Sequence, residues 1–182
     1  MAGSGQMTAP ALRALNDGEL TGSWTLDAAR SEVRLRSRSM WGLAAVNGVF
    51  RDVSGDATVT EAGAVSGTIA VRAASVDTKN KKRDEHLRSA EFFDVDRHPV
   101  ITFSVDGVRP SGPGVAVTGE LTVRGVTRPL YFDAQVSSFD GAEVWLDAQV
   151  TVDRSDFGLT WSPMRMASMD NTITIHAVLT RG

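Results

Sequence analysis

The chain has no cysteine among its 182 residues, which excludes disulfide bonds and thiolate metal sites. It also lacks the roughly 18 consecutive apolar residues that a membrane-spanning helix needs. Lys and Arg (19) do not outnumber Asp and Glu (22), and a net charge of −3 argues against nucleic acid as the main partner. The first 20 residues lack the basic start and long apolar run of a secretory signal. These absences predict a soluble, cytoplasmic protein without a transmembrane segment.

Motifs of familiar enzyme classes are missing as well. The sequence contains neither a Gly-x-Ser-x-Gly nucleophile elbow nor a Gly-rich phosphate loop. Nothing in the spacing of the three histidines, His86, His98 and His176, brings them together as zinc ligands. We therefore expect no catalytic residue, no metal and no required cofactor. An isomerase or hydrolase acting on a lipophilic substrate is the alternative, because barrels of this type can host such enzymes.

What the chain does contain is alternation of apolar and polar residues. Val33 and Leu35 alternate with charged residues in 31–39, and the pattern is clearest in 115–124. A period of two is typical of a strand with one buried face. Similar stripes occur at 65–76, 101–105, 130–136, 144–152 and 173–179. Eight or nine strands joined by short turns predict an all-β fold, an extended antiparallel eight-stranded barrel that includes one short helix.

The domain organisation follows from where this pattern begins. Residues 1–20 are small, polar and aperiodic, which predicts a flexible N-terminal extension before a single barrel domain at 21–182. One charged segment, 83–94, interrupts the strands and ends in two adjacent phenylalanines. We expect it to form a short helix across the barrel mouth, clamped by the phenylalanines, since burying one such side chain gains about 1.5–3 kcal/mol. On this helix Asp84 and Arg88 are four residues apart and are expected to pair.

Several motifs, taken together and in this order, resemble the YceI-like family. They are Arg83-Asp84-Glu85-His86-Leu87-Arg88-Ser89, Phe92-Phe93-Asp94, Pro99-Val100-Ile101-Thr102-Phe103, Gly119-Glu120-Leu121-Thr122, Gly125-Val126-Thr127-Arg128-Pro129 and Asp153-Arg154-Ser155-Asp156-Phe157-Gly158-Leu159. The resemblance runs from about Trp24 to the C-terminus. It implies a lipocalin-like barrel whose elongated apolar pore binds polyisoprenoid lipids, such as isoprenoid quinones or prenyl diphosphates. Some family members are periplasmic and carry a signal peptide, a feature that this sequence does not show.

The inward stripes predict where such a ligand would lie. They contain small residues, among them Gly67, Gly119 and Ala148, which either leave room for a ligand or let a tapering core close tightly. The residues expected to line the pore are Phe50, Ile69, Val71, Phe103, Val117, Leu121, Leu130, Phe132, Leu146 and Val150. Those expected to close its ends are Trp41, Phe92, Phe157, Trp161 and Met164. We expect tail burial to dominate binding, because each CH₂ removed from water gains about 0.8 kcal/mol.

Polar residues near the helix are candidates for contact with a lipid headgroup. They are Arg83, Asp84 and His86, although Arg83 and Asp84 equally suit a role in pinning the helix to a strand or to Asp156. For Arg154 with Asp156 the alternatives are an ion pair at a corner of the fold, which we expect, and a binding site. The basic run 79–83 is either a solvated turn or a patch that meets an anionic headgroup or a membrane surface.

The predicted function is non-catalytic binding, sequestration or transport of an isoprenoid or other long-tailed amphiphilic lipid, of the quinone or prenyl diphosphate class. A bound polyisoprenoid or quinone is the ligand that the resemblance implies. A third alternative is an interaction module in which a homodimer contact covers Trp145, which lies on the outward face of its strand.

Overall fold

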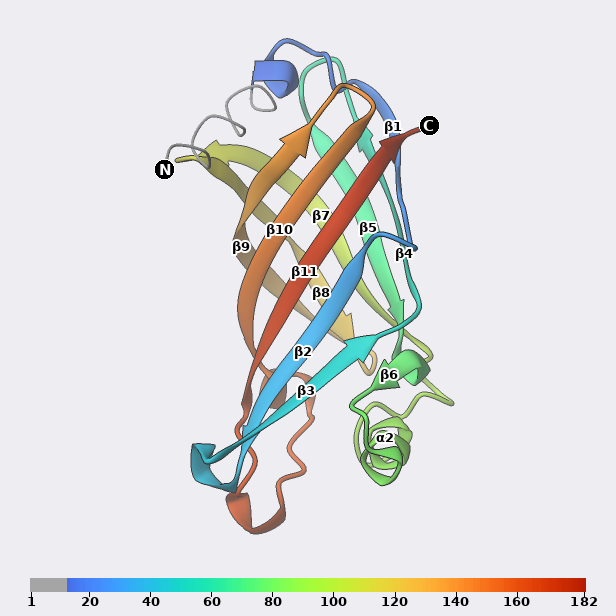
Figure 1. Cartoon of the computed structure of the whole chain (residues 1–182), viewed down its shortest axis with the longest axis vertical. Helices are drawn as coiled ribbons and strands as arrows, with labels where there is room; N and C mark the ends of the chain where they lie inside the picture. Colours follow the sequence, from blue (N-terminus) through green and yellow to red (C-terminus); the bar gives the residue numbers. More distant parts are fainter. Residues whose placement is uncertain (1–12) are drawn as a thin grey trace.

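Eight antiparallel strands close into a barrel in the computed structural model, which describes residues 13–182 (Figure 1). Their order around the ring is β1 (Gly22–Leu26), β4 (Val53–Val59), β5 (Val65–Arg72), β7 (Val100–Ser111), β8 (Gly114–Val123), β9 (Val126–Phe139), β10 (Glu143–Asp153) and β11 (Asp170–Arg181). Pairing of Trp24 with Arg181 and of Leu26 with Leu179 joins β1 to β11 and closes the ring. The predicted lipocalin-like fold, all-β with a short helix, is confirmed.

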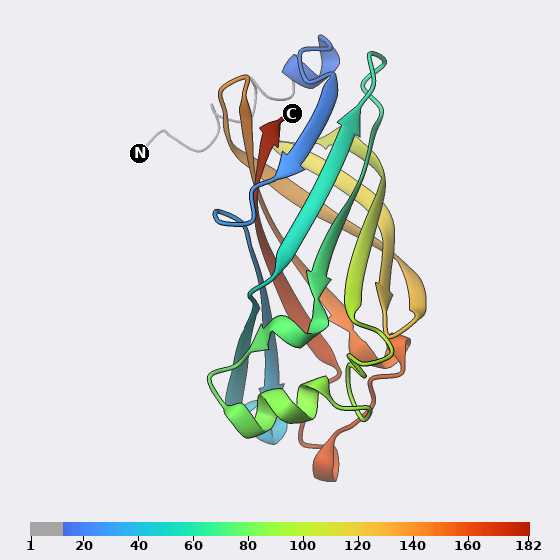
Figure 2. The same ribbon diagram turned by 90° about the vertical axis from the view of Figure 1, so that its right-hand side faces the viewer.

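One end of this barrel, the lower end in Figure 1, is built differently. The upper residues of β11 pair with β1, while residues 171–176 pair with β2 (Glu32–Ser39). Strand β2 pairs with β3 (Ala44–Phe50), and β3 pairs with the short β6 (Val76–Asp77). Within the part of the chain that the structure describes, β6 has no further strand neighbour. The helix α2 (Lys81–Arg88) lies at this open side of the lower end (Figures 1 and 2).

The helix is held to the end of β6 by its own charged residues. Asn80 caps it by accepting a hydrogen bond from the backbone N–H of Arg83. The buried carboxylate of Asp84 accepts hydrogen bonds from the backbone N–H and the hydroxyl of Thr78. The guanidinium of Arg83 donates to the hydroxyl and the carbonyl oxygen of Thr78, each at 2.8 Å. Both side chains therefore hold the helix to Thr78 at the end of β6, and this attachment is one of the two roles predicted for them.

The predicted pairing of Asp84 with Arg88 on the helix surface is wrong. Arg88 instead donates to the backbone carbonyls of Ala74 and Val76. These hydrogen bonds to the backbone before α2 thus replace the Asp84–Arg88 ion pair that the spacing in the sequence predicts.

The two phenylalanines after the helix fill the lower end from inside. Phe92 and Phe93 are 8% and 6% exposed, and their rings pack edge to face with the centroids 4.8 Å apart. The ring of Phe93 also packs edge to face against the ring of Phe50 on β3, with the centroids 6.0 Å apart. The predicted clamp is confirmed, and it fixes the position of α2 over the lower end.

The short connections follow from residues that adopt left-handed backbone. Between β8 and β9, Arg124 (φ 51°) and Gly125 (φ 74°) form the turn, and Val123 pairs with Val126. A two-residue turn with positive φ at both positions matches the twist of the strands it joins. The hairpin predicted at 125–129 is therefore present, one residue earlier than expected.

The upper end is closed by a segment that the sequence did not predict to fold. Residues 13–16 are helical and lie over this end of the barrel (Figure 1). Ala14, Leu15 and Leu20 are buried in a hydrophobic cluster with Trp24 and Val59. The prediction of a flexible extension is therefore wrong for residues 13–20, because their apolar side chains cover the barrel; residues 1–12 of that prediction lie outside the described part. Over residues 13–182, no helix has the length and apolarity needed to cross a bilayer.

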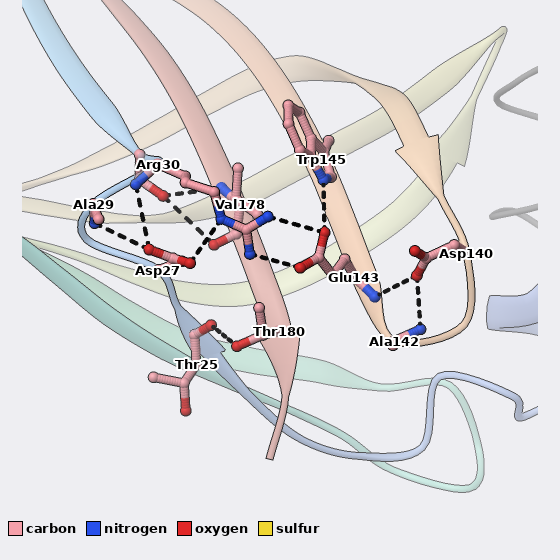
Figure 3. A network of polar contacts seen from close by, with 11 residues as sticks. Thr25, Asp27, Ala29, Arg30, Asp140, Ala142, Glu143, Trp145, Val178 and Thr180 are labelled. Atoms are coloured by element: carbon pink, nitrogen blue, oxygen red, sulfur yellow. Dashed lines mark hydrogen bonds and ion pairs between the residues drawn. The ribbon is translucent and has the colours of Figure 1, made fainter.

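A polar network on the outer surface joins the connection between β1 and β2 to β10 (Figure 3). Arg30 bridges Asp27 and Glu143, with N–O distances of 2.7 and 2.6 Å. Its hydrogen bond to Glu143 is the main cause that lowers the pKa of this carboxyl. The Arg30 guanidinium also lies 5.9 Å from the ring of Trp145, whose indole N–H donates to Glu143. Trp145 is thus half-buried within one chain, and the homodimer stays a prediction.

Candidate functional site

The barrel interior contains a series of cavities along its axis. Three inner ones, which we call the lower, middle and upper cavities, measure about 80, 110 and 120 Å³. The lower cavity is lined by Leu35, Phe50, Phe92, Phe93, Ile101, Leu121, Val123, Val152, Arg154, Phe157, Leu159, Asn171 and Ile173. The middle cavity is lined by Gly55, Asp56, Ala57, Val65, Ser66, Gly67, Thr68, Ile69, Phe103, Val105, Val108, Val117, Phe132, Ala134, Leu146, Ala148, Ile175, Ala177 and Leu179. The upper cavity is lined by Leu15, Leu20, Trp24, Ala57, Val59, Val65, Val108, Val115, Val117, Val136, Val144, Leu146 and Leu179.

A fourth cavity, the mouth cavity, lies beneath α2 and is the largest of the series, at about 510 Å³. Its lining residues are Leu35, Ser37, Arg38, Ser39, Val46, Gly48, Thr78, Asn80, Lys82, Arg83, His86, Leu87, Phe92, Arg154, Trp161, Met166, Ala167 and Asn171. Four of these residues are cationic, and none of the described lining residues is acidic. The series therefore changes from an entirely apolar lining at the top to a positively charged one at the mouth.

Shared lining residues show how the cavities follow one another. The mouth and lower cavities share Phe92 and Arg154, and the middle and upper cavities share Val117 and Leu146. The lower and middle cavities share no lining residue. Leu121 lines the former, and its cross-strand partner Phe103 lines the latter. The predicted single pore is thus divided at this pair of side chains.

The small residues on the inner face do not all serve the cavities. Ala148 lines the middle cavity, as expected of a residue that leaves room. At Gly119, by contrast, an added Cβ would lie 2.1 Å from the backbone oxygen of Ser104 and 2.8 Å from the ring of Phe103. Gly119 therefore makes room for Phe103 rather than for a ligand, and no side chain fits there without a shift of backbone.

Arg154 is the most buried cation of the site. It is 6% exposed, and its guanidinium donates to the backbone oxygens of Ser168 and Leu159. It lies 5.6 Å from the ring of Phe92, and its burial lowers the pKa of the guanidinium. The predicted ion pair with Asp156 is wrong: within residues 13–182, no carboxylate lies in ion-pair range of Arg154. A buried positive charge that Asp153 attracts only from beyond ion-pair distance thus lies between the mouth and lower cavities.

His86 supplies the second unusual polar group of the mouth. Its ring packs on Trp161 with the centroids 4.1 Å apart, and Nδ1 lies 3.4 Å from a carboxylate oxygen of Glu91. The other ring nitrogen, Nε2, is buried and has no hydrogen-bond partner among the described residues. Leaving a buried polar atom without a hydrogen bond costs about 1–3 kcal/mol. A ligand group that forms a hydrogen bond with Nε2 would remove this cost.

Most of the predicted lining residues contact the cavities, although they divide among all four. Those that line one are Phe50, Ile69, Phe92, Phe103, Val117, Leu121, Phe132, Leu146, Phe157 and Trp161. Val71 and Leu130 instead pack in hydrophobic clusters, and Val150 is half-buried opposite Ile173. Period-two alternation therefore predicts the inward face well, but it does not show where that face is tightly packed.

Trp41 and Met164 do not close the ends of the barrel. They are 72% and 79% exposed, and each has left-handed backbone, with φ of 55° and 51°. Both lie at tips of loops, where the side chain turns away from the interior.

Of the headgroup candidates, only Arg83 and His86 line the mouth cavity. Asp84 faces Thr78 and does not line it, because its carboxylate serves the helix attachment. Sequence reasoning missed Arg38 as a site residue and favoured an ion pair for Arg154, whereas Lys82 belongs to the basic run 79–83, for which contact with a headgroup was one of the two predicted roles. The sequence signal for Arg154 was its position within one of the recognised motifs.

Known proteins share both the sequence pattern and the fold. A family model described as the YceI-like domain matches residues 24–180. A UPF0312 protein of Serratia proteamaculans is 34% identical over 135 residues, which cover 70% of each chain. Protein YceI of Salmonella newport is 33% identical over 120 residues, covering 62% of this chain and 63% of the relative. The aligned part thus covers 70% of the length of the first relative and 63% of the length of the second.

Solved structures with the same barrel come from several bacteria. BcnA of Burkholderia cenocepacia has a TM-score of 0.76 at 24% identity, covering 84% of this chain and 98% of that one. A polyisoprenoid binding domain of Saccharophagus degradans has a TM-score of 0.70 at 16% identity, covering 87% and 98%. The YceI protein of Campylobacter jejuni has a TM-score of 0.66 at 25% identity, covering 77% and 87%.

Proposed function

The chain belongs to the YceI-like family, and from this premise we propose that it binds a long-tailed amphiphilic lipid, with the tail in the barrel and the headgroup in the mouth cavity. The observation that carries the proposal is the gradient along the cavity series, from apolar at the upper end to cationic at the mouth. A polyisoprenoid binding domain with the same barrel supports the isoprenoid class, as a quinone or a prenyl diphosphate. We propose that the role is sequestration or transport.

The tail would link cavities that side chains separate from one another. Each inner cavity is smaller than the cavity of about 150 Å³ that holds one benzene molecule in an engineered protein core. A long tail must therefore displace side chains at two junctions, Phe92 above the mouth and the pair of Leu121 and Phe103 further in.

The energetics favour this arrangement. Burying about 15–20 tail carbons gains a gross ~12–16 kcal/mol at ~0.8 kcal/mol each. Association and ordering cost roughly 4–15 kcal/mol. The tail thus supplies most of the affinity, and the junction side chains that it displaces exchange one apolar contact for another.

The headgroup class follows from the charges of the mouth. Arg154 is buried and forms no ion pair with a carboxylate of the described chain, and His86 Nε2 is buried without a hydrogen bond. Arg38, Lys82 and Arg83 add positive charge to a lining without acids. Such a site favours a headgroup that accepts hydrogen bonds or bears negative charge, such as a phosphate, a carboxylate or a quinone carbonyl, and disfavours an ammonium group.

We propose a role without catalysis. The cations of the lining are arginine and lysine side chains, which bind negatively charged groups. His86 is the only imidazole among the described lining residues, and it is the side chain that general acid–base chemistry uses most often. A single group of this kind supports binding better than a reaction that needs an acid and a base.

The test is organic extraction of the purified protein followed by mass spectrometry, with an unrelated protein of similar preparation as the background. We expect an intact lipid with a long apolar tail in the extract of this protein alone. The absence of any lipid, together with no uptake of an added isoprenoid quinone or phosphate, would overturn the proposal. A chemically altered lipid after incubation would instead support the enzyme alternative.

A further inference from the structure

Large apolar side chains are exposed together at the lower end of the barrel. Six large hydrophobic residues are exposed in the described chain, and four of them, Trp41, Leu43, Trp161 and Met164, lie on two loops. These loops contain the turns η1 (Met40–Gly42), between β2 and β3, and η4 (Pro163–Arg165), between β10 and β11. Both turns lie at the lower end in two views (Figures 1 and 2). We call residues 38–43 and 159–168 the tip.

The two loops of the tip are joined to each other by backbone hydrogen bonds. The N–H of Trp41 donates to the carbonyl of Met166 at 3.2 Å, and the N–H of Ser168 donates to the carbonyl of Arg38 at 2.8 Å. Trp41, Met164 and Arg165 all have positive φ, which non-glycine residues seldom adopt. The hydrogen bonds between the two loops and the left-handed backbone therefore hold these apolar side chains in outward-facing positions.

The charged residues of the tip itself are both cationic. The tip contains Arg38 and Arg165 and no acidic residue. Lys81 and Lys82, at the start of α2, are exposed, and Lys82 lines the mouth cavity together with Arg38. None of these four cations forms an ion pair with a residue of the described chain. Four cations that form no ion pair within the described chain thus flank the exposed apolar residues, with the exposed acids Glu85 on α2 and Asp170 after the tip as their nearest counterparts in the sequence.

We propose that the tip docks the protein on an anionic membrane surface. Trp41, Leu43 and Met164 enter the interfacial region of the bilayer, where tryptophan and aliphatic side chains partition favourably. The cations Arg38, Arg165, Lys81 and Lys82 contact anionic headgroups, as basic residues beside an apolar patch do. A second copy of the chain is a poorer occupant, because a two-fold contact between tips would bring like charges together.

The position of the tip gives this docking a consequence for ligand exchange. Arg38, Trp161 and Met166 belong to the tip and also line the mouth cavity. A tip inserted in the interface therefore turns the mouth toward the bilayer, so that a lipid moves between membrane and barrel without crossing water. The docking itself goes beyond the proposed function, since the surface exists whether or not the barrel holds a lipid.

The experiment is cosedimentation of the full-length protein with vesicles of phosphatidylcholine alone or mixed with phosphatidylglycerol. We expect binding to the mixed vesicles that weakens with added salt, and at least about tenfold weaker binding when Trp41→Ser, Leu43→Ser and Met164→Ser are combined. Lys81→Glu with Lys82→Glu is expected to remove the preference for the anionic lipid. Tyr131→Ser is the matched control, because Tyr131 is 68% exposed on β9, outside the tip, and its loss should change nothing.

A second readout tests insertion directly. Lipids with brominated tails quench the fluorescence of tryptophans that enter the interface, and Trp41→Phe is expected to remove most of this quenching. Equal vesicle binding by the wild type and the triple variant would overturn the proposal, as would no binding at all. If the wild type is a dimer, and the triple variant differs from it only in being a monomer, then the exposed residues form a subunit contact. This result would also overturn the proposal. Vesicle binding by a protein that takes up no lipid would refute the proposed function and leave docking intact.

Discussion

Replacing Ala148 by phenylalanine is predicted to shorten the tail that the barrel accepts. Ala148 lies on β10 and lines the middle cavity, with Val152 lining the lower cavity and Val144 the upper one along the same strand. The middle cavity measures about 110 Å³. An aromatic ring added there fills a space smaller than the ~150 Å³ known to hold benzene. Overpacking of this kind costs about 1–3 kcal/mol of stability.

The loss of affinity follows from the carbons that the ring excludes. A tail stopped below Ala148 cannot reach the upper cavity or most of the middle one. Excluding about five methylenes at ~0.8 kcal/mol each removes ~4 kcal/mol of binding free energy. This corresponds to a rise in Kd of about three orders of magnitude for a long tail. A short amphiphile, whose tail ends in the lower cavity, should bind almost as before.

The assay is displacement of a bound fluorescent lipid by amphiphiles that share one headgroup and differ in tail length. For the wild type, affinity is expected to rise with each added carbon until the upper cavity is filled. For Ala148→Phe the rise should stop at a shorter tail. Gln149→Phe is the matched control, since Gln149 is the next residue on β10 and is exposed. A folded Ala148→Phe protein whose affinities follow the wild type at every length would refute a tail that passes Ala148.

Three further predictions concern the elements that frame the barrel. Asp84→Ala leaves the backbone N–H of Thr78 without its acceptor, and urea denaturation should show a loss of about 1–3 kcal/mol; an equal loss in Glu85→Gln, which changes an exposed neighbour, would count against this cause. The pKa of Asp77 is lowered from 3.8 to about 2, chiefly by the backbone N–H of Lys79 and then by Arg51. Its contribution to stability is therefore complete above about pH 4 and is lost as the pH falls toward 2, so Asp77→Asn should flatten this part of a stability–pH curve; an unchanged curve would contradict the assignment. Leu15→Ala should cost about 2–5 kcal/mol in thermal or urea unfolding, because Leu15 covers the upper cavity, and a change near zero would show that residues 13–20 do not close the barrel.

Strand alternation predicted the barrel and most of its inward face. Val117, Leu146 and Phe132 line cavities because a period of two settles which side chains point inward once the sheet closes. Alternation gives no information on axial packing. It therefore did not show that Phe103 lies over Gly119, which becomes visible only when β7 and β8 are placed in register.

The errors at the site have a common physical cause. Apolar character suggested burial for Trp41 and Met164, but left-handed loop backbone turns them outward. Spacing on a helix suggested an Asp84–Arg88 pair, but contacts with the neighbouring wall replaced it. The unpaired burial of Arg154 also depends on residues remote in sequence. Local rules predict local geometry, whereas the mouth cavity is assembled from β2, α2 and the loop before β11.

The most direct test of the tail-in-barrel proposal is a crystal structure of the protein with a long-tailed isoprenoid quinone or phosphate bound. We predict continuous density that starts beside His86 and Arg154, passes a rotated Phe92 and reaches the middle cavity at Ala148. A lipid bound only on the outer surface, with the inner side chains unmoved and the inner cavities empty, would contradict it.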